Sequence, residues 1–421
     1  MRFRTLAMLT CAATTTVAVA PARAAGWAFD LEVAAEIRAF PNDPQYPGQF
    51  EHFQPSGTLT PELSWESADR KHEIVIKPFA RIDGQDDERT HADLREAFYR
   101  YVSDGDWSVL IGVNKVFWGV TESRHLVDIV NQTDAVEDID EEDKLGEAMV
   151  QFTLQKDWGK FDFFVMPGFR ERTFPGVDGR LRFELAVDDD NPVFERDGGR
   201  GAVDLAGRYS HYFGSWDVGL SIFHGTSREP RFAIPQTNDR ILPVYDRITQ
   251  IGADIQYTKD AWLWKGEAIV REGQGDTFFA AVAGFEYTLY QIGGRSWDLG
   301  LLAEYLYDGR DDGFAPEVID PINGPEQTAL VTETPVTIFN NDVFVGARLA
   351  LNDTQDTSML AGTAIDAEDG TMSAFIEAER RIGTSWKAEL EARLFLNVDQ
   401  GNFVDAFRDD DVVTARLTRY F

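Results

Sequence analysis

Residues 27–39 read WAFDLEVAAEIRA, and apolar and charged side chains alternate along this stretch. The side chains that share the apolar face are Trp27, Phe29, Leu31, Val33, Ala35, Ile37 and Ala39, and those on the charged face are Asp30, Glu32, Glu36 and Arg38. A period of two predicts a β-strand with one apolar and one charged face. Such a strand fits either the edge of a soluble sandwich or the wall of a membrane barrel.

Segments with the same pattern recur along the chain and decide between these two folds. Each has roughly 10 residues, the length that a tilted strand needs to cross the hydrocarbon layer of a membrane. They are 27–39, 58–66, 73–83, 94–103, 107–118, 147–156, 160–169, 202–212, 216–226, 247–258, 261–271, 277–291, 297–308, 342–351, 358–366, 371–382, 386–396 and 412–421. The sequence therefore predicts an all-β fold, a transmembrane antiparallel up-and-down β-barrel of 18 strands, with 16 strands as the alternative.

The connections between these segments mostly alternate between short and long. The short ones are tight polar turns, such as 67–70, 104–106, 157–159 and 383–385, and the long ones lie near 119–146, 170–201, 227–246 and 309–341. Outer-membrane barrels have short periplasmic turns and longer external loops. The supposed external connections 272–276 and 367–370 are short and depart from the rule.

Tryptophan gathers at one end of the expected strands. Eight of the 10 tryptophans form the expected periplasmic girdle, namely Trp27, Trp65, Trp107, Trp216, Trp262, Trp264, Trp297 and Trp386. Trp158 also lies at a short turn, and only Trp118 lies beside a long loop. Because an indole prefers the boundary between membrane and water, this distribution favours a barrel wall over scattered core residues.

The first 24 residues have the features of a secretory signal peptide. Arg2 and Arg4 precede an apolar stretch, and Ala22-Arg23-Ala24 offers a cleavage motif. We therefore expect a signal peptide at 1–24 and an outer-membrane β-barrel at 25–421. The only cysteine, Cys11, lies too early for a lipoprotein signal, so 25–421 contains no thiol.

Charge and composition exclude several classes of function. The net charge of −32 becomes −35 once Arg2, Arg4 and Arg23 are removed, and a chain this acidic has no basic stripe with which to bind nucleic acid. Hydrophobic residues at 43% and aromatic residues at 12% are too abundant for a disordered chain.

We expect no catalytic site and no cofactor. The six histidines occur in no nucleophile-elbow or H-E-x-x-H context. The acidic run 137–143 lacks the glycine of an EF-hand loop, and a charge run in an external loop is normally solvated. Calcium at acidic external loops stays open as an alternative.

The charged faces of the strands are expected to line a water-filled lumen in which acids and bases are interleaved. The residues that we expect there include Arg38, Arg81, Arg100, Arg208, Arg348, Arg393, Glu32, Glu36, Glu267 and Glu304. A long polar loop that follows a strand can fold into such a lumen. We therefore expect a pore constriction at 119–146, and its expected residues are Trp118, Arg124, His125, Asp128 and Asn131. The alternative is a purely external loop.

Two motifs resemble known families. LREAFY at 94–99, LIGVNKVFWG at 110–119 and then Asp128, Asn131 and Asp134 resemble a motif of proteobacterial porin-like outer-membrane β-barrel families, which are largely uncharacterised. In those families the strand ends in G-R-Q and the loop reads D-x-x-N-P-x-D, whereas this chain has Asn114-Lys115 and Gln132. The terminal Phe421, after an alternating strand, resembles the signal read by the barrel assembly machinery.

These features predict a porin-like channel in the outer membrane of a Gram-negative bacterium. It would pass small polar solutes by passive diffusion, and it would not be an enzyme or bind nucleic acid. The expected partners are outer-membrane lipid and lipopolysaccharide, the assembly machinery and the solutes, and a homotrimer is an open possibility. The alternative is a non-transporting surface-binding or envelope-structural barrel.

Overall fold

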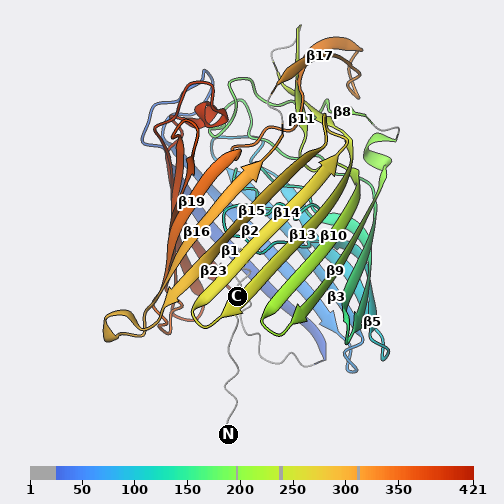
Figure 1. The fold of residues 1–421 in the computed structure, drawn as a ribbon, viewed down its shortest axis with the longest axis vertical. Helices are drawn as coiled ribbons and strands as arrows, with labels where there is room; N and C mark the ends of the chain where they lie inside the picture. Colours follow the sequence, from blue (N-terminus) through green and yellow to red (C-terminus); the bar gives the residue numbers. More distant parts are fainter. Residues whose placement is uncertain (1–24, 196–197, 237–239, 311–312) are drawn as a thin grey trace.

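The computed structural model describes residues 25–195, 198–236, 240–310 and 313–421. The expected signal peptide, 1–24, lies outside these ranges. Eighteen strands form one closed sheet (Figure 1). They are β1 (Gly26–Ala39), β2 (Phe53–Glu66), β3 (His72–Asp83), β4 (Ala92–Val102), β5 (Trp107–Asn114), β6 (Glu147–Lys156), β7 (Gly159–Pro167), β9 (Val203–Phe213), β10 (Trp216–Thr226), β13 (Arg247–Lys259), β14 (Trp262–Glu272), β15 (Phe278–Leu289), β16 (Asp298–Asp308), β19 (Asn341–Ala350), β20 (Ser358–Asp366), β21 (Met372–Ile382), β22 (Trp386–Leu396) and β23 (Val412–Tyr420).

The barrel closes through its first and last strands. One edge of β1 pairs with β2 from Gly26 opposite Glu66 to Ala39 opposite Phe53, and the other edge pairs antiparallel with β23. Closure leaves no strand edge unpaired, which a sheet in lipid requires. The expected all-β barrel of 18 strands is confirmed, and each expected segment overlaps one barrel strand.

The two faces of the wall follow the alternation that the sequence predicts. On β1, Ile37 is 44% exposed on the outer face, whereas Glu36 and Arg38 on either side of it are buried inside the barrel. An outward apolar belt and an inward polar face are the pattern of a membrane-spanning barrel. No described helix is long and apolar enough to cross a membrane.

One strand departs from strict alternation. On β4 both Arg95 and Phe98 are buried towards the interior, although they are three residues apart. The pairing of β3 with β4 shifts register between Lys77 and Pro78. Beside it on β5, Gly112 has φ +141°, and a Cβ there would lie 2.2 Å from the carbonyl oxygen of Ala97. The shift brings Arg95 towards the lumen, where the candidate site uses it.

A second, smaller sheet covers part of one end of the barrel (Figure 1). This external cap consists of β8 (Val193–Phe194), β11 (Arg231–Pro235), β12 (Leu242–Tyr245), β17 (Phe314–Ile319) and β18 (Gln327–Thr332). Three short 3-10 helices complete the described elements: η1 (Gly199–Gly201), η2 (Ile292–Gly294) and η3 (Phe403–Phe407). The sequence pattern predicted plain loops here, because strands of two to six residues are too short to show a period.

The girdle tryptophans all lie at the opposite end, where the short turns are. Trp27 is the register partner of Trp65, and their rings are 6.3 Å apart. Trp107, Trp216, Trp262 and Trp386 each begin a strand, Trp264 follows two residues into β14, and Trp297 directly precedes β16. Their position at a bilayer boundary remains a prediction.

Candidate pore constriction

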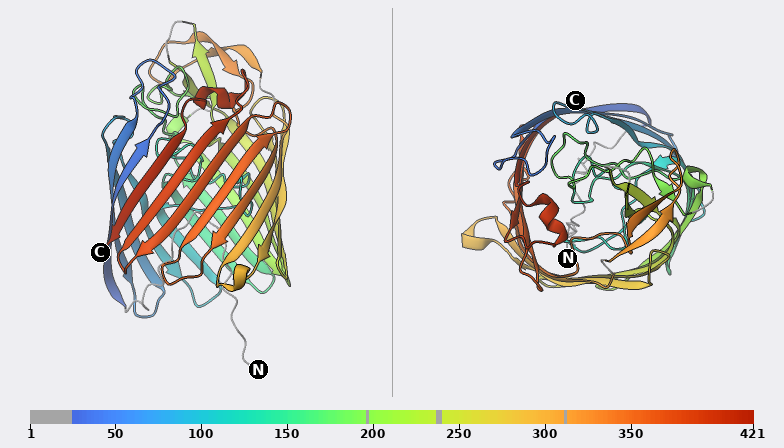
Figure 2. Two further views of the ribbon diagram at one scale, coloured as in Figure 1. Left: turned by 90° about the vertical axis from the view of Figure 1, so that its left-hand side faces the viewer. Right: turned by 90° about the horizontal axis from the view of Figure 1, so that it is seen from above.

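A long loop between β5 and β6 runs inside the barrel. This constriction loop, residues 115–146, lies within the ring of strands when the barrel is viewed along its axis (Figure 2). A chain segment inside a barrel must satisfy its backbone polar groups and bury its apolar side chains. The contacts described below show that the two halves of this loop do so in different ways.

The first half is held by apolar packing. Trp118, Leu126, Val127, Ile129 and Val130 are buried and form one cluster with lumen-facing residues of the wall. Those wall residues include Phe164 on β7, Phe223 on β10, Ile269 on β14, Val282 on β15 and Phe344 on β19. The Trp118 ring meets the Phe164 ring edge to face, with centroids 5.7 Å apart. Burial of one such side chain contributes about 1.5–3 kcal/mol to stability. This packing holds the first half of the loop against its side of the lumen wall.

Two carboxylates of the wall accept hydrogen bonds from the same half of the loop. Glu267 Oε1 on β14 accepts from the backbone N–H of Val120 at 2.6 Å and of Thr121 at 3.1 Å, and its Oε2 accepts from Val127 N–H at 3.2 Å. Glu304 on β16 accepts from the backbone N–H groups of residues 122 and 123, at 2.8 and 2.9 Å. Wall carboxylates thus replace the water that these loop N–H groups would otherwise bind.

The second half of the loop reaches other strands through ion pairs. Glu137 accepts from Arg81 on β3, with Nε to Oε1 at 2.8 Å. Asp138 accepts from Arg38 on β1 at 3.0 Å and from Arg393 on β22. These carboxylates enter a low-dielectric space with guanidinium partners, which offset much of the cost of burying their charge.

The constriction loop therefore crosses the lumen as a strap. Arg81 on β3 and Glu267 on β14 are eight strand pairings apart in one direction around the ring and ten in the other. A loop fixed to both strands is anchored on nearly opposite walls, which narrows the opening of the barrel.

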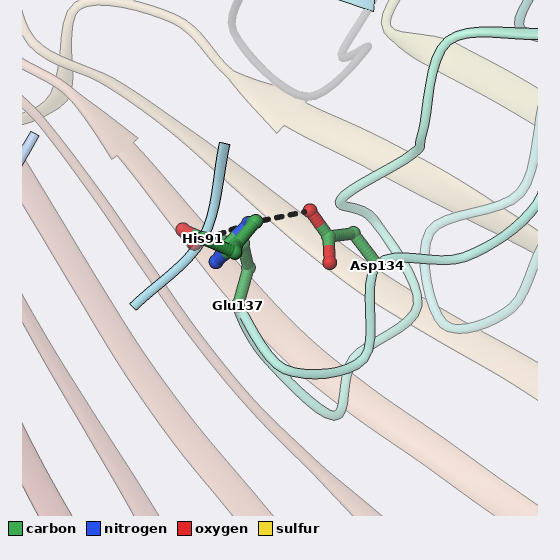
Figure 3. A group of neighbouring side chains, drawn as sticks. All are labelled: His91, Asp134 and Glu137. Carbon is green, nitrogen blue, oxygen red and sulfur yellow. Dashed lines mark ion pairs between the residues drawn. The ribbon is translucent and has the colours of Figure 1, made fainter. Parts of the chain in front are cut away.

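A histidine lies beside the strap at its second half (Figure 3). His91 comes from the loop before β4, and its Nε2 lies 3.4 Å from Asp134 Oδ2 and 3.5 Å from Glu137 Oε1. Arg95 Nη2 donates to the same Asp134 oxygen at 2.6 Å. Burial alone would raise the pKa of Asp134, but the imidazole of His91 beside it and the charge of Arg95 outweigh this effect, so the pKa is lowered.

Two groups of side chains have the spacing of metal ligands in the described ranges. They are His91 with Asp134 and Glu137, and Asp138 with Asp140 and Glu391. Arginine already supplies positive charge in both, since Arg81 and Arg95 contact the first group and Arg393 contacts all three members of the second. This chemistry fits an ion-pair network better than a metal centre.

The five residues expected at the constriction all help to hold the strap in place. Asn131 bridges the two ends of the loop, because its amide donates to the carbonyls of Asn114 and Leu145, both at 2.9 Å. Asp128 accepts from Trp118 N–H at 3.2 Å, Arg124 pairs with Asp308 of β16 at 2.8 Å, and His125 Nδ1 lies 3.9 Å from Glu267. Trp118 is buried in the apolar cluster.

The ten residues expected to line the lumen all lie on the inner face and fall into three sets. Arg38, Arg81, Arg393 and Glu36 surround the second half of the strap, and Arg208, Arg348, Glu267 and Glu304 contact the first half. Glu32 pairs with Arg416 at 3.5 Å, and Arg100 pairs with Glu73 at 3.0 Å, both away from the strap.

The acidic run 137–143 differs from its sequence-based interpretation. We expected it in a solvated external loop, but Glu137 is buried against Arg81, and Asp138 and Asp140 contact Arg393 inside the barrel. The expectation was wrong because the wall arginines that balance these acids come from strands distant in sequence. Glu122, which no sequence motif marks, pairs with Arg348 at 2.7 Å and with Lys265 at 3.4 Å.

Comparisons with known proteins bear on the fold. No family model and no curated protein sequence matches the chain. Among solved structures, it resembles Pseudomonas aeruginosa OccK9 (OpdG), with 10% identity, a TM-score of 0.52 and coverage of 94% of this chain and 97% of that one. It also resembles a BenF-like porin from Pseudomonas fluorescens Pf-5, with 9% identity, a TM-score of 0.51 and coverage of 94% and 97%.

A third neighbour has a different role. Wzi of Escherichia coli, described as an outer-membrane protein involved in group 1 capsule assembly and as a carbohydrate-binding β-barrel, has 8% identity, a TM-score of 0.52 and coverage of 92% and 83%. At these identities the likeness shows the fold alone. A closed antiparallel barrel of this size with an apolar outer belt is the architecture of Gram-negative outer-membrane proteins. The chain is an outer-membrane β-barrel.

Proposed function

We propose that this 18-stranded outer-membrane barrel is a porin-like channel for passive diffusion of small polar solutes, and that residues 115–146 form its constriction. A barrel of this strand number is wide enough to leave an aqueous path unless loops fill it. The strap fills only part of the lumen. The observation that carries the proposal is Glu377 on β21, whose side chain faces inward yet is exposed to solvent.

The orientation of Glu377 follows from its neighbours on the strand. Phe375, two residues earlier, stacks on Phe344 within the interior cluster, at a centroid distance of 6.0 Å. Ile376 is 45% exposed on the outer face. Residue 377 therefore points inward, and its exposure indicates water inside the barrel next to β21.

The test is electrical recording of the purified chain in planar bilayers. We expect discrete conductance steps from wild-type protein. Deletion of 139–143 removes the tip of the strap and leaves its apolar half in place, so the step size should increase. A matched deletion in the external cap, 322–326 between β17 and β18, should leave the step size unchanged. Absence of any conductance from correctly folded barrels would reject the channel.

A second candidate function is a surface-binding barrel that transports nothing. The external cap favours it, because Phe314 and Val318 on β17 and Leu330 on β18 are exposed apolar side chains on one face of a hairpin. The neighbour Wzi, which is described as a carbohydrate-binding β-barrel, supports this candidate. Two results together would favour this candidate. Purified barrels would pass no current in bilayers, and they would bind a surface ligand that is no longer bound when Phe314 and Val318 are replaced by serine.

The proposal assigns the chain no catalytic activity. Lipid hydrolysis by the purified barrel, abolished by substitution of a single serine or histidine, would contradict this assignment.

A further inference from the structure

The strap divides the interior of the barrel into two unequal environments. On one side, the wall residues Phe164, Phe223, Ile269, Val282 and Phe344 are buried in one cluster with Trp118, Leu126, Val127, Ile129 and Val130 of the strap. Phe223 and Ile269 are each only 1% exposed, although both belong to the inner face of the wall. At these residues the wall is covered by the strap and is not in contact with solvent.

On the other side, polar groups of both the wall and the strap are exposed. Residues 140–143 of the strap are exposed or half-exposed, as is Glu377 on β21. Glu379, Glu389 and Arg416, which follow along β21, β22 and β23, have side chains that are 24%, 34% and 25% exposed. Solvent therefore reaches the lumen between the strap tip and the wall formed by β21, β22 and β23.

Carboxylates face one another across this gap. The strap contributes Glu122, Asp140 and Glu142, and the wall contributes Glu377 and Glu391; we name these five side chains the acidic passage. Oxygens of Asp140 and Glu391 lie within 4.8 Å of each other. Enclosure within the barrel raises the pKa of Glu142, and the charges of Asp140, Glu377 and Glu122 raise it further, to about 8. The contact of Asp140 with Glu391 on β22 and the ion pair of Glu122 with Arg348 on β19 place strap carboxylates beside this part of the wall.

Basic side chains do not balance this charge. Arg393 forms ion pairs with three carboxylates, those of Asp138, Asp140 and Glu391. Glu122 forms ion pairs with Arg348 and Lys265. Among the residues that the structure describes, the Glu142 and Glu377 carboxylates have no ion-pair partner. Asp138, which also pairs with Arg38, brings the number of carboxylates to six. The bases that contact them are four, namely Arg38, Lys265, Arg348 and Arg393, so the net charge is −2 when all ten groups are ionised.

We propose that solutes cross the barrel off-centre, between the strap tip and the β21–β22 wall, and that the acidic passage favours cationic small solutes such as organic amines. This inference rests on the proposed channel function and names its solute class. Low-dielectric walls concentrate the field of the unbalanced carboxylates on a passing ion, so a small excess of charge has a large effect on selectivity.

The position of the route is tested by cysteine modification in the full chain with Cys11→Ser. Glu377→Cys lies on the open side, and Ala206→Cys lies on the sealed side of the same inner face. A cationic methanethiosulfonate reagent should lower the conductance of the first variant at least about twofold and leave the second unchanged. An anionic reagent should react more slowly with Glu377→Cys. Block of the Ala206→Cys variant alone would overturn the route.

The charge preference is tested by reversal potential in a KCl gradient. Wild-type channels should pass K⁺ in preference to Cl⁻, and Glu377→Gln and Glu142→Gln should each move the permeability ratio towards one. Glu286→Gln, an inward acid on β15 outside the passage, is the matched control and should change the ratio least. Anion preference in conducting wild-type channels overturns this inference alone, whereas absence of conductance overturns the proposed function as well.

Discussion

The two halves of the constriction loop occupy the same barrel but obey different physical rules. Residues 116–130 carry buried apolar side chains and hydrogen-bond to carboxylates of the wall, whereas 137–143 carry acids that meet arginines or water. The difference teaches that one loop can pack against one side of a lumen and expose charge to the other. In the channel proposed above, the apolar half determines where the solute cannot go, and the ionic half determines which solute passes.

The largest expected effect comes from breaking the sealed half. Trp118→Ala removes a ring that is 4% exposed and packed on Phe164. Truncation of a buried tryptophan costs about 3–5 kcal/mol, and here the loss releases the first half of the strap. We expect a larger, noisier conductance and a lower midpoint for urea unfolding.

The matched control for this prediction is Trp27→Phe, since Trp27 is 62% exposed at the short-turn end and touches no part of the strap. Its conductance should equal that of the wild type. An unchanged conductance in Trp118→Ala, with the urea midpoint lowered, would show that the strap does not narrow the path.

An intermediate effect is expected at Glu267, which joins the sealed half to β14. Glu267→Ala leaves the N–H groups of Val120, Thr121 and Val127 without their acceptor. Each unsatisfied buried group costs about 1–3 kcal/mol. Glu267→Gln keeps one carbonyl oxygen, which can still accept from Val120 and Thr121, and loses only the bond from Val127.

The measurement is limited proteolysis of the strap together with single-channel conductance. Cleavage within 115–146 should be fastest in Glu267→Ala, slower in Glu267→Gln and slowest in the wild type. Equal rates for the two variants would mean that the charge of Glu267, and not its acceptor geometry, holds the strap.

The sequence predicted the number and order of the barrel strands because lipid on one side and water or strap on the other impose a period of two on the spanning strands, with an irregularity only at the β3–β4 pairing. It also indicated that a long loop after 107–118 could enter the lumen. It did not show which half of that loop would seal, since Val127 and Ile129 acquire partners on β13, β14 and β15 that lie more than 100 residues away. The cap strands were missed because pairs such as Ala233 with Val331 follow no local period.

The same limit explains the acidic run. From sequence alone, the six acids and one isoleucine of 137–143 indicate only a solvated loop. Arg38, Arg81 and Arg393, which hold the run inside the barrel, lie on three strands that meet only through closure of the ring. The acids and the arginines that balance them are brought together only by closure of the barrel, so no short stretch of sequence contains both partners.

The smallest expected effect concerns the open half and its response to pH. Enclosure in the barrel raises the pKa of Asp143 as well, to about 7, and the charges of Glu137 and Asp140 add to the rise. Because the pKa values of Asp143 and Glu142 lie above their usual range, both groups are neutral below these values and gain negative charge as pH rises through 7 to 8. The acidic passage should therefore become more selective for cations between pH 6 and pH 9.

Reversal potentials across this range measure the change. Besides enclosure in the barrel, the charges of Asp140, Glu377 and Glu122 raise the pKa of Glu142, and the charge of His125 lowers it. Burial lowers the pKa of His125, but the neighbouring Glu267 carboxylate outweighs burial and raises it, and loss of the His125 proton acts in the same direction because it removes a positive charge. Glu142→Gln should reduce the rise in cation selectivity at the upper end of this pH range. His125→Gln should leave the rise at that end unchanged. A cation selectivity that does not change with pH in the wild type would mean that the permeating ion passes too far from these carboxylates to sense their charge. The two halves of the strap would then differ in their packing but not in their effect on the ion.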